Sequence, residues 1–311
     1  MTISEPYPIM NLFNFNICIV RFPGPIPAFE AYREVAETVK YGLQALGYNA
    51  IISDDKLMDN SVNIVFGWQF WQQSDPARYS MLSESTIFYN LEKIPDLPGI
   101  LPSILLAAKS RVPIWDYNIE NCDLIRQRYW GSTVYYVPIG YMPEMSRISP
   151  AIEQDIDVLF YGGVTERRGK ILEDLKNAGL KVEVLQNLFG LERDQYIARA
   201  KVVLNIHPGQ SMYWGSLKNT FEIVRVSYLL ANSKAVVSEY SEKSTSIEDD
   251  LLNALVLVDY KDLVQACLDL VNNVKKRRVY EKEGFSVMSA RDETIYLREA
   301  LLKTFHRNED S

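Results

Sequence analysis

Residues 157–168 read DVLFYGGVTERR and are the clearest indication of the fold class. The apolar run 157–161 is typical of a buried strand, Gly162 and Gly163 of a tight loop, and the charged residues after them of a helix start. A strand that leads through a short loop into a helix is the repeating unit of parallel sheets covered by helices. The stretch therefore predicts an α/β protein.

The same alternation of apolar and amphipathic segments extends in both directions from this stretch. We expect helices at 29–46, 102–110, 166–177, 192–200 and 219–231, followed by a largely helical segment at 261–305. The expected strands of the first half are 16–22, 49–53, 62–67, 86–91, 112–117 and 134–139. Those of the second half are 157–161, 181–185, 202–206, 235–238 and 255–258. This pattern predicts two Rossmann-like doubly wound sheets and a helical C-terminal tail.

The length and the position of chain-breaking residues predict two domains. A chain of 311 residues suits two units of roughly 150 residues, and glycine and proline gather in the segment 138–143. We expect an N-terminal acceptor-side domain at 1–143, a second domain at 151–290, and a C-terminal helix and tail at 291–311. Two wound domains place a ligand in a cleft at the carboxyl ends of their strands.

Composition excludes several classes of protein. The chain is 47% hydrophobic and 23% charged, which is typical of a globular protein. A net charge of -7 supplies no basic field for nucleic acid. The 3 cysteines show no C-x-x-C spacing, which argues against a disulfide framework or a zinc site. No stretch approaches the ~18 apolar residues that span a bilayer, and the N-terminus lacks an export signal. We expect a cytoplasmic protein.

The loop at Gly162 and Gly163 is a candidate anion site. A strand that runs through paired glycines into a helix exposes unpaired amide groups at the positive end of the helix dipole. Arg167 and Arg168 follow in the first turn and would add positive charge. An ordinary turn with solvated arginines explains the same residues equally well. The stretch is neither a G-x-G-x-x-G nor a Walker motif, which lowers the nicotinamide and ATPase interpretations.

Three further residues of the second half are candidates for donor binding. His207 follows the expected strand 202–206 and would lie at its carboxyl end, where it can donate to a phosphate or carry a proton. Glu222 and Arg225 lie three apart on one helical face, where a carboxylate binds ribose hydroxyls and a guanidinium binds phosphate. The alternatives are a histidine that caps its own loop and a surface ion pair.

Aromatic and acidic side chains follow the expected strands of the first half. Aromatic rings beside a carboxylate are suited to stacking a sugar or another flat acceptor. The candidate acceptor-binding residues are Gly24, Glu30, Trp68 and Trp71. Glu92 and Asp116 are candidate catalytic bases, with His207 as a third candidate catalytic residue. Tryptophans that fill the seam between two domains would produce the same pattern.

Asp155 and Asp157 have the D-x-D spacing of a metal-binding motif. They enter a strand instead of leaving one, so their carboxylates should lie at the opposite end of the sheet. We therefore expect no metal site.

The segment 155–240 resembles the nucleotide-sugar-binding domain of group 1 glycosyltransferases of the GT-B type, in the branch that includes spore-maturation-like bacterial proteins. The matching stretches are 157–163, 166–168, 193–194, 200–207, 221–225, 230–232 and 235–239. The linker 137–141 stands in the expected place, and the first half is matched by architecture only. One departure is Tyr228, which stands where group 1 enzymes carry a second glutamate.

The resemblance implies transfer of a sugar from a UDP-, GDP- or related nucleoside-diphosphate sugar, without an obligatory metal or other cofactor. On matching positions, Gly163 and Arg167 or Arg168 would face the donor phosphates. Glu222 would face ribose or sugar hydroxyls, and Arg225 the diphosphate. The acceptor, whether glycan, lipid-linked sugar, peptide or small natural product, stays open. The alternatives are a nucleotide-sugar epimerase of the same fold and a non-catalytic sugar-nucleotide-binding protein.

Overall fold

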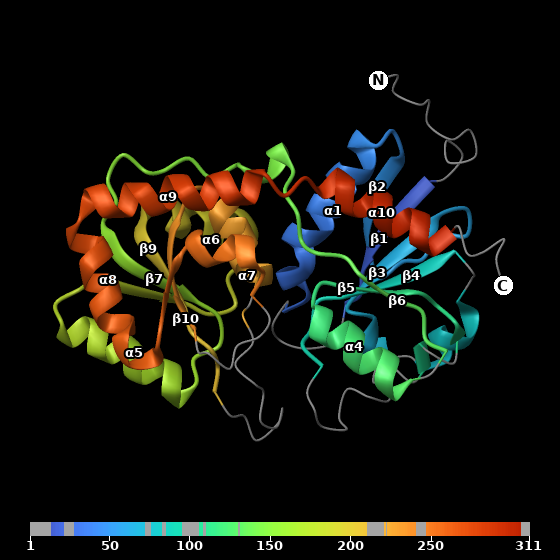
Figure 1. Ribbon diagram of the computed structural model, residues 1–311, viewed down its shortest axis with the longest axis horizontal. Coiled ribbons are helices and arrows are strands. Elements are labelled where there is room, and N and C mark those ends of the chain that lie inside the picture. The colour runs from blue at the N-terminus through green and yellow to red at the C-terminus, as the bar shows by residue number, and fades with distance from the viewer. Residues whose placement is uncertain are drawn as a thin grey trace.

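The structure is a computed structural model that describes residues 14–21, 28–71, 76–82, 85–94, 106–107, 110–129, 131–209, 221, 223–240 and 247–305. Within these residues the chain forms two parallel sheets, one in each half, and helices cover both (Figure 1). The expected pair of wound α/β sheets with a helical C-terminal part is confirmed.

The first sheet has six strands in the order β2-β1-β3-β4-β5-β6. The strands are β1 (Asn14–Ile19), β2 (Asn49–Asp54), β3 (Val62–Phe66), β4 (Thr86–Asn90), β5 (Ile114–Asp116) and β6 (Val134–Tyr136). Its helices are η2 (Ala28–Tyr32), α1 (Arg33–Ala45), η3 (Trp68–Phe70), η4 (Pro76–Met81) and α4 (Ile119–Arg128). Every residue of β3 and β4 is buried, as expected for central parallel strands that are covered on both faces.

The second sheet has five strands in the order β11-β10-β9-β7-β8. They are β7 (Ile156–Tyr161), β8 (Val182–Leu185), β9 (Ala200–Asn205), β10 (Ala235–Glu239) and β11 (Val256–Val258). The helices of this half are α5 (Glu166–Asn177), α6 (Gly190–Arg199), α7 (Ile223–Ala231), α8 (Leu263–Asn272) and α9 (Val274–Ser289). Shorter turns are η5 (Pro143–Met145), η6 (Asp249–Asn253) and η7 (Tyr260–Asp262). The expected helix 166–177 has the bounds that the sequence predicts.

The sequence pattern did not predict helix α4. Its sequence IENCDLIRQR buries only three residues and carries no pronounced apolar stripe. The helix starts because the side chain of Asn118 accepts hydrogen bonds from the backbone N–H groups of Glu120 and Asn121. The expected helix 102–110 lies mostly outside the described residues.

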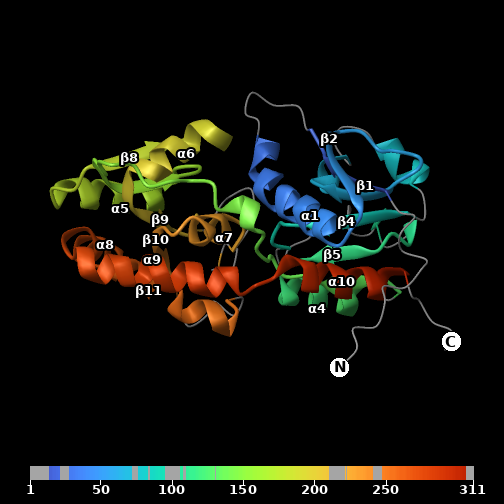
Figure 2. The ribbon, with the colours of Figure 1, turned by 90° about the horizontal axis from the view of Figure 1, so that it is seen from above.

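The two segments that connect the halves lie side by side. The backbone N–H of Tyr141 donates to the carbonyl of Arg291 at 2.6 Å, and the N–H of Gly140 donates to Oε2 of Glu293 at 2.8 Å. The final helix, α10 (Glu293–Phe305), then packs against the first half, where Nε1 of Trp115 donates to Oγ1 of Thr304 at 2.9 Å. In Figure 2, α9 runs along the second half and α10 continues along the first. The domain limits 1–143, 151–290 and 291–311 stay predictions.

We expect Glu293 to make stability depend on pH. Burial raises the pKa of its carboxyl from 4.5 to about 8. The folded chain therefore holds a proton that the unfolded chain releases, so stability falls as pH rises from about 4.5 to about 8 and then levels. Glu293→Gln keeps an acceptor for Gly140 and has no proton to lose. In urea unfolding, it should gain stability over the wild type between pH 5 and pH 8.5, on the order of a few kcal/mol.

Glu299→Gln is the matched control, because Glu299 lies on the same helix and its side chain is exposed. Its stability should follow that of the wild type at every pH. Parallel pH curves for the wild type and Glu293→Gln would contradict the prediction.

Candidate functional site

The carboxyl ends of β7, β9 and β10 form one edge of the second sheet. Tyr161 ends β7, Asn205 ends β9, and Ser238 pairs directly with Asn205 in the sheet register. Ligands of wound α/β domains bind at this edge, where loops follow the strands and helices begin. The segments 161–168 and 205–209 therefore border the candidate site.

Arg225 in the first turn of α7 reaches the loop that follows β7. Its Nη1 donates to Oδ1 of Asn205 at 3.1 Å, and its guanidinium carbon lies 5.3 Å from the ring centroid of Tyr161. Gly162 has φ +130, and a Cβ there would lie 3.1 Å from Nη2 of Arg225. Glycine at 162 therefore allows both the backbone conformation and the close approach of the guanidinium.

Asn205 holds Arg225 without neutralising its charge. The Asn205 side chain is a neutral amide whose Nδ2 donates to Oγ of Ser238 at 3.0 Å. Both side chains are buried. The amide oxygen is thereby oriented toward the guanidinium beside Gly162.

The start of α5 is joined to the segment that follows β9. Oγ1 of Thr165 accepts the backbone N–H of Arg168 and donates to the carbonyl of Pro208 at 3.0 Å. Among the described residues, no atom lies within 4 Å of where a Cβ at Gly163 would be. The described part of the chain therefore leaves space beside this glycine.

Arg167 lies at this edge with its charge matched by Glu239. Its Nη1 donates to Oε2 of Glu239 at 2.7 Å and to the carbonyl of His207 at 3.2 Å. The guanidinium also lies 3.7 Å from the ring centroid of Tyr260. Glu239 is 3% exposed, so a buried carboxylate holds the guanidinium of Arg167 in place.

Arg168 fastens the loop after β7 to the end of β9. Its Nε donates to the carbonyl of Ile206 and its Nη1 to the carbonyl of Gly163, both at 2.9 Å. The side chain is buried. The structure therefore brings Arg167, Arg168 and Arg225 to one edge and gives Arg168 internal carbonyls as partners.

His207 lies at the same edge, as the sequence predicts from the end of its strand. Its side chain is buried, and its backbone N–H donates to Oε2 of Glu239 at 3.1 Å. Glu222 lies outside the described residues.

In the first half, Glu92 and Asp116 occupy different environments. Asp116 is 0% exposed and accepts hydrogen bonds from the side chains of Asn90 and Asn121. Burial raises the pKa of Asp116 to about 7, although these donors lower it. Glu92 is half-buried, and its Oε1 accepts from Oη of Tyr32 at 2.7 Å. Glu92 is therefore the more accessible of the two acids.

Trp68 and Trp71 lie in the core. Each is 1% exposed, and the ring of Trp68 stacks on Phe88 with centroids 4.6 Å apart. Their packing leaves no ring face for an acceptor, so the structure does not place them in an acceptor site. Glu30 pairs with Arg33 at 2.8 Å, and Gly24 lies outside the described residues.

A buried ion network joins the two halves, and no function was expected for its members from the sequence. Arg193 of α6 is 4% exposed, and its Nη2 donates to Oε1 of Glu34 on α1 at 2.7 Å and to Oδ1 of Asp194 at 2.8 Å. Oη of Tyr228 donates to Oδ2 of Asp194 at 2.6 Å. Two adjacent charges on a helix give no signal of a partner 159 residues away.

This network lies between α1 of the first half and the carboxyl end of β7 in the second. Helix α1, which follows β1, carries Glu34 close to its start. On the other side, the guanidinium carbon of Arg193 lies 5.5 Å from the ring centroid of Tyr161, the last residue of β7. Arg193 therefore links Glu34 of α1 to the last residue of β7.

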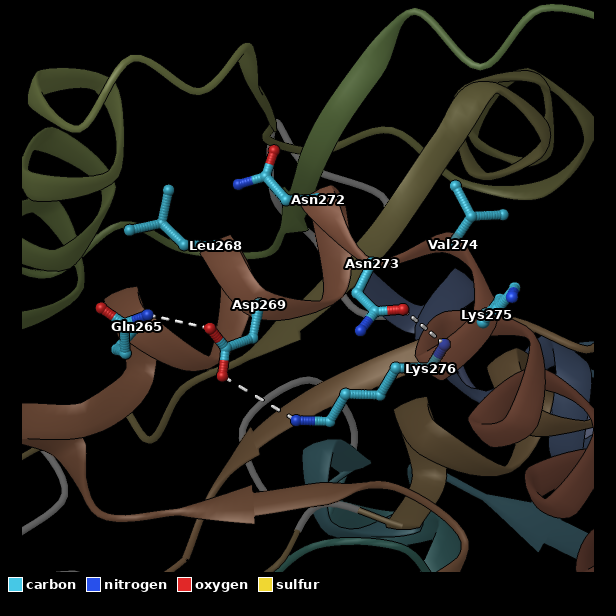
Figure 3. Close-up of a pocket in the computed structure, with 8 residues that line it drawn as sticks. All are labelled: Gln265, Leu268, Asp269, Asn272, Asn273, Val274, Lys275 and Lys276. Carbon is cyan, nitrogen blue, oxygen red and sulfur yellow. Dashed lines mark hydrogen bonds and ion pairs between the residues drawn. The ribbon is translucent and has the colours of Figure 1, made fainter.

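A surface depression of about 770 Å³ lies elsewhere, at the turn between α8 and α9 (Figure 3). The polar side chains there bind one another: Nε2 of Gln265 donates to Oδ1 of Asp269 at 2.9 Å, and Nζ of Lys276 lies 3.8 Å from Oδ2 of Asp269. Figure 1 places this turn at the outer end of the second half, away from the first. The depression is thus separate from the edge that carries Arg225.

Asp155 and Asp157 lie at the amino end of β7, as expected. Their carboxylates pair with Arg199 and Lys201. Among the described residues, no three His, Cys, Asp or Glu side chains converge on a common point. No helix in the described part of the chain is long and apolar enough to cross a membrane.

Comparison with known sequences finds relatives without an assigned activity. No protein-family model matches the chain. The uncharacterized protein L140 of Acanthamoeba polyphaga mimivirus is 29% identical over 166 residues, which cover 52% of this chain and 51% of that protein. The uncharacterized protein R358 of the same virus is 27% identical over 196 residues, 62% of this chain and 63% of that protein. This chain therefore spans about half to two thirds of these relatives' length.

Comparison with solved structures identifies the fold class. A glycosyltransferase from Rickettsia africae superposes with a TM-score of 0.56 at 10% identity, over 96% of this chain and 100% of that one. HepE from Anabaena, solved in complex with UDP-glucose, superposes with a TM-score of 0.58 at 10% identity, over 93% and 98%. The chain thus has the GT-B fold. Its bacterial origin and its place in the spore-maturation-like branch stay predictions, since the relatives above are viral.

Proposed function

We propose that this protein is a glycosyltransferase that takes its sugar from a nucleoside-diphosphate sugar, with the donor diphosphate at the carboxyl edge of the second sheet. The observation that carries this proposal is the guanidinium of Arg225 held beside Gly162 by the neutral amide of Asn205. The structural neighbour HepE was solved with UDP-glucose, which supports the choice of donor class.

The arrangement suits the departure of a diphosphate. When the bond between the anomeric carbon and the phosphate oxygen breaks, negative charge grows on the leaving group. A fixed guanidinium and the amide groups at the start of α5 would stabilise that charge. In this proposal Arg225 contacts the diphosphate, Gly163 lines its site, and Arg167, Arg168 and His207 shape the loops around it.

The acceptor would bind on the side of the first half. Glu92 is the candidate base there, because it is half-buried whereas Asp116 has no exposed surface. A glycan, a lipid-linked sugar, a peptide or a small natural product remains a possible acceptor.

Donor binding tests the proposal directly. UDP-glucose, UDP-N-acetylglucosamine, GDP-mannose, TDP-glucose and a CMP-sugar would be compared by thermal shift. At about 100 times its dissociation constant, a ligand of the native state adds about 2.7 kcal/mol of stability. We expect one of the four nucleoside-diphosphate sugars to raise the melting temperature. A shift with the CMP-sugar alone, or no shift at all, would contradict the proposal.

Two glycine variants test where the donor binds. Gly162→Ala should weaken binding of that nucleotide sugar at least tenfold, because the new Cβ displaces the guanidinium of Arg225. Gly179→Ala is the matched control: Gly179 has φ +86 at the other end of α5, and no atom of the described residues lies within 4 Å of a Cβ built there. It imposes comparable backbone strain, so equal losses of affinity would refute the assignment. Calorimetric titration measures both.

A further inference from the structure

The carboxyl ends of β4 and β5 carry a buried cluster of one acid and three amide side chains. Asp116 ends β5 and stands opposite Asn90, the last residue of β4, in the sheet register. Asn118 and Asn121 follow at the start of α4. All four are buried.

Both oxygens of Asp116 accept hydrogen bonds from this cluster. Oδ2 accepts from Nδ2 of Asn90 at 2.7 Å. Oδ1 accepts from the backbone N–H of Asn118 at 2.8 Å and from Nδ2 of Asn121 at 3.0 Å. The carboxylate therefore orients the two amides and is enclosed by them.

The oriented amides in turn hold the backbone of Glu92. Nδ2 of Asn90 and Nδ2 of Asn121 donate to the carbonyl of Glu92 at 2.7 and 2.9 Å. Oδ1 of Asn90 accepts the N–H of Glu92 at 3.2 Å, and Oδ1 of Asn121 accepts the N–H of Ile94 at 3.0 Å. Four hydrogen bonds thus fix the short segment 92–94.

The side chain of Glu92 binds a residue outside this cluster. Its Oε1 accepts from Oη of Tyr32, which in turn accepts from Nε2 of Gln69 at 3.1 Å. Glu92 lies two residues after Asn90, the last residue of β4, and ligands of wound α/β domains bind at the carboxyl ends of the strands. The Glu92 carboxylate therefore lies near the ligand-binding edge of the first sheet.

We propose that Asp116 is a positioning residue: it fixes Asn90 and Asn121, which hold Glu92 where its carboxylate takes the proton of the acceptor hydroxyl. This inference rests on the proposed glycosyltransferase function. The acceptor oxygen forms a bond to the anomeric carbon while its proton passes to Glu92. The bond from that carbon to the phosphate oxygen breaks, its electron pair leaves with the nucleoside diphosphate, and the anomeric configuration inverts.

A double-mutant cycle tests this role. Wild type, Glu92→Gln, Asp116→Asn and the double variant would be assayed with the nucleotide sugar that binds best in the panel above, with water as acceptor and release of nucleoside diphosphate as readout. We expect Glu92→Gln to lower kcat at least 10²-fold and Asp116→Asn about tenfold, with the dissociation constant for donor unchanged. In the Glu92→Gln background, Asp116→Asn should have no further effect, since residues that act through one another are not additive.

Asn121→Ala is a second variant in case Asp116→Asn fails to fold. It removes the hydrogen bonds from the Asn121 side chain to the backbone of Glu92 and Ile94. It should lower kcat in the wild-type background and leave the kcat of Glu92→Gln unchanged. Asn63→Ala is its matched control: Asn63 is buried in the same sheet, and its side chain binds the backbone N–H and carbonyl of Met58. We expect Asn63→Ala to lose stability and to keep kcat.

The outcomes separate the two proposals. If the wild type binds no nucleotide sugar, the proposed function fails. If donor binds and turns over but Asp116→Asn, or Asn121→Ala in its place, lowers kcat equally with and without Glu92, Asp116 has a structural role only and the inference is overturned. Donor binding without any release of nucleoside diphosphate overturns the assignment of Glu92 as the base.

Discussion

Arg225→Ala should lower the rate of sugar transfer about 10²- to 10³-fold while the protein stays folded. That is the size of effect seen when a single preorganised group that stabilises developing charge is removed. The loss falls on kcat, because negative charge on the leaving diphosphate grows most in the transition state. Release of nucleoside diphosphate from the best-binding nucleotide sugar measures it, and circular dichroism checks the fold.

Arg199→Ala is the matched control for this variant. Arg199 pairs with Asp155 at the amino end of β7, and its side chain is 44% exposed. An exposed ion pair contributes little to stability, and this one lies at the opposite edge from Gly162. Full activity in Arg225→Ala, or an equal loss in Arg199→Ala, would refute the role of Arg225.

Arg193→Ala should lower the free energy of unfolding by about 3–5 kcal/mol, the range for breaking a buried ion pair by removal of one partner. The substitution leaves the carboxylates of Glu34 and Asp194 buried without their shared cation. Burial raises the pKa of Glu34 and Arg193 lowers it, so this acid should titrate at higher pH in the variant. Urea unfolding at pH 7 measures the loss.

Two further variants sharpen this prediction. Arg199→Ala, on the same helix, should lose about 1 kcal/mol or less. Adding Glu34→Gln to Arg193→Ala should recover part of the stability, because it removes the buried charge of Glu34, whereas Asp194 still has Arg147 at 3.8 Å. Stability within 1 kcal/mol of the wild type in Arg193→Ala would show that the contact between α1 and α6 contributes little to holding the halves together.

The second sheet could be predicted closely because its signals are local. Helix α5 begins at the residue after its cap, Thr165, and is followed by Gly179 with φ +86. Residues next to the helix therefore mark where it begins and where it ends. Helix α4 has a cap residue, Asn118, but only three of its residues are buried, so no apolar stripe indicated a helix. A polar segment becomes helical there because the sheet supplies the surface on which it packs.

The location of the candidate site residues could be predicted better than their binding partners. Gly162 and Arg225 lie together as the pattern implied, because the carboxyl ends of parallel strands share one edge. Arg167 and Arg168 were expected to face phosphate, yet their partners are Glu239 and the carbonyl of Ile206, 72 and 38 residues away. No local spacing encodes such partners.

The amino-acid sequence by itself determined the α/β class and the two wound sheets, and it predicts the edge at which a ligand would bind. Hydrophobic periodicity, caps and glycines act over a few residues, and parallel strands then bring their ends to one side. Only the tertiary structure decided that Trp68 and Trp71 are core residues, that Asp116 is enclosed, and that Arg193 joins the halves. These outcomes depend on burial and on partners distant in sequence, since a side chain's accessibility and charge balance are set by everything that packs around it.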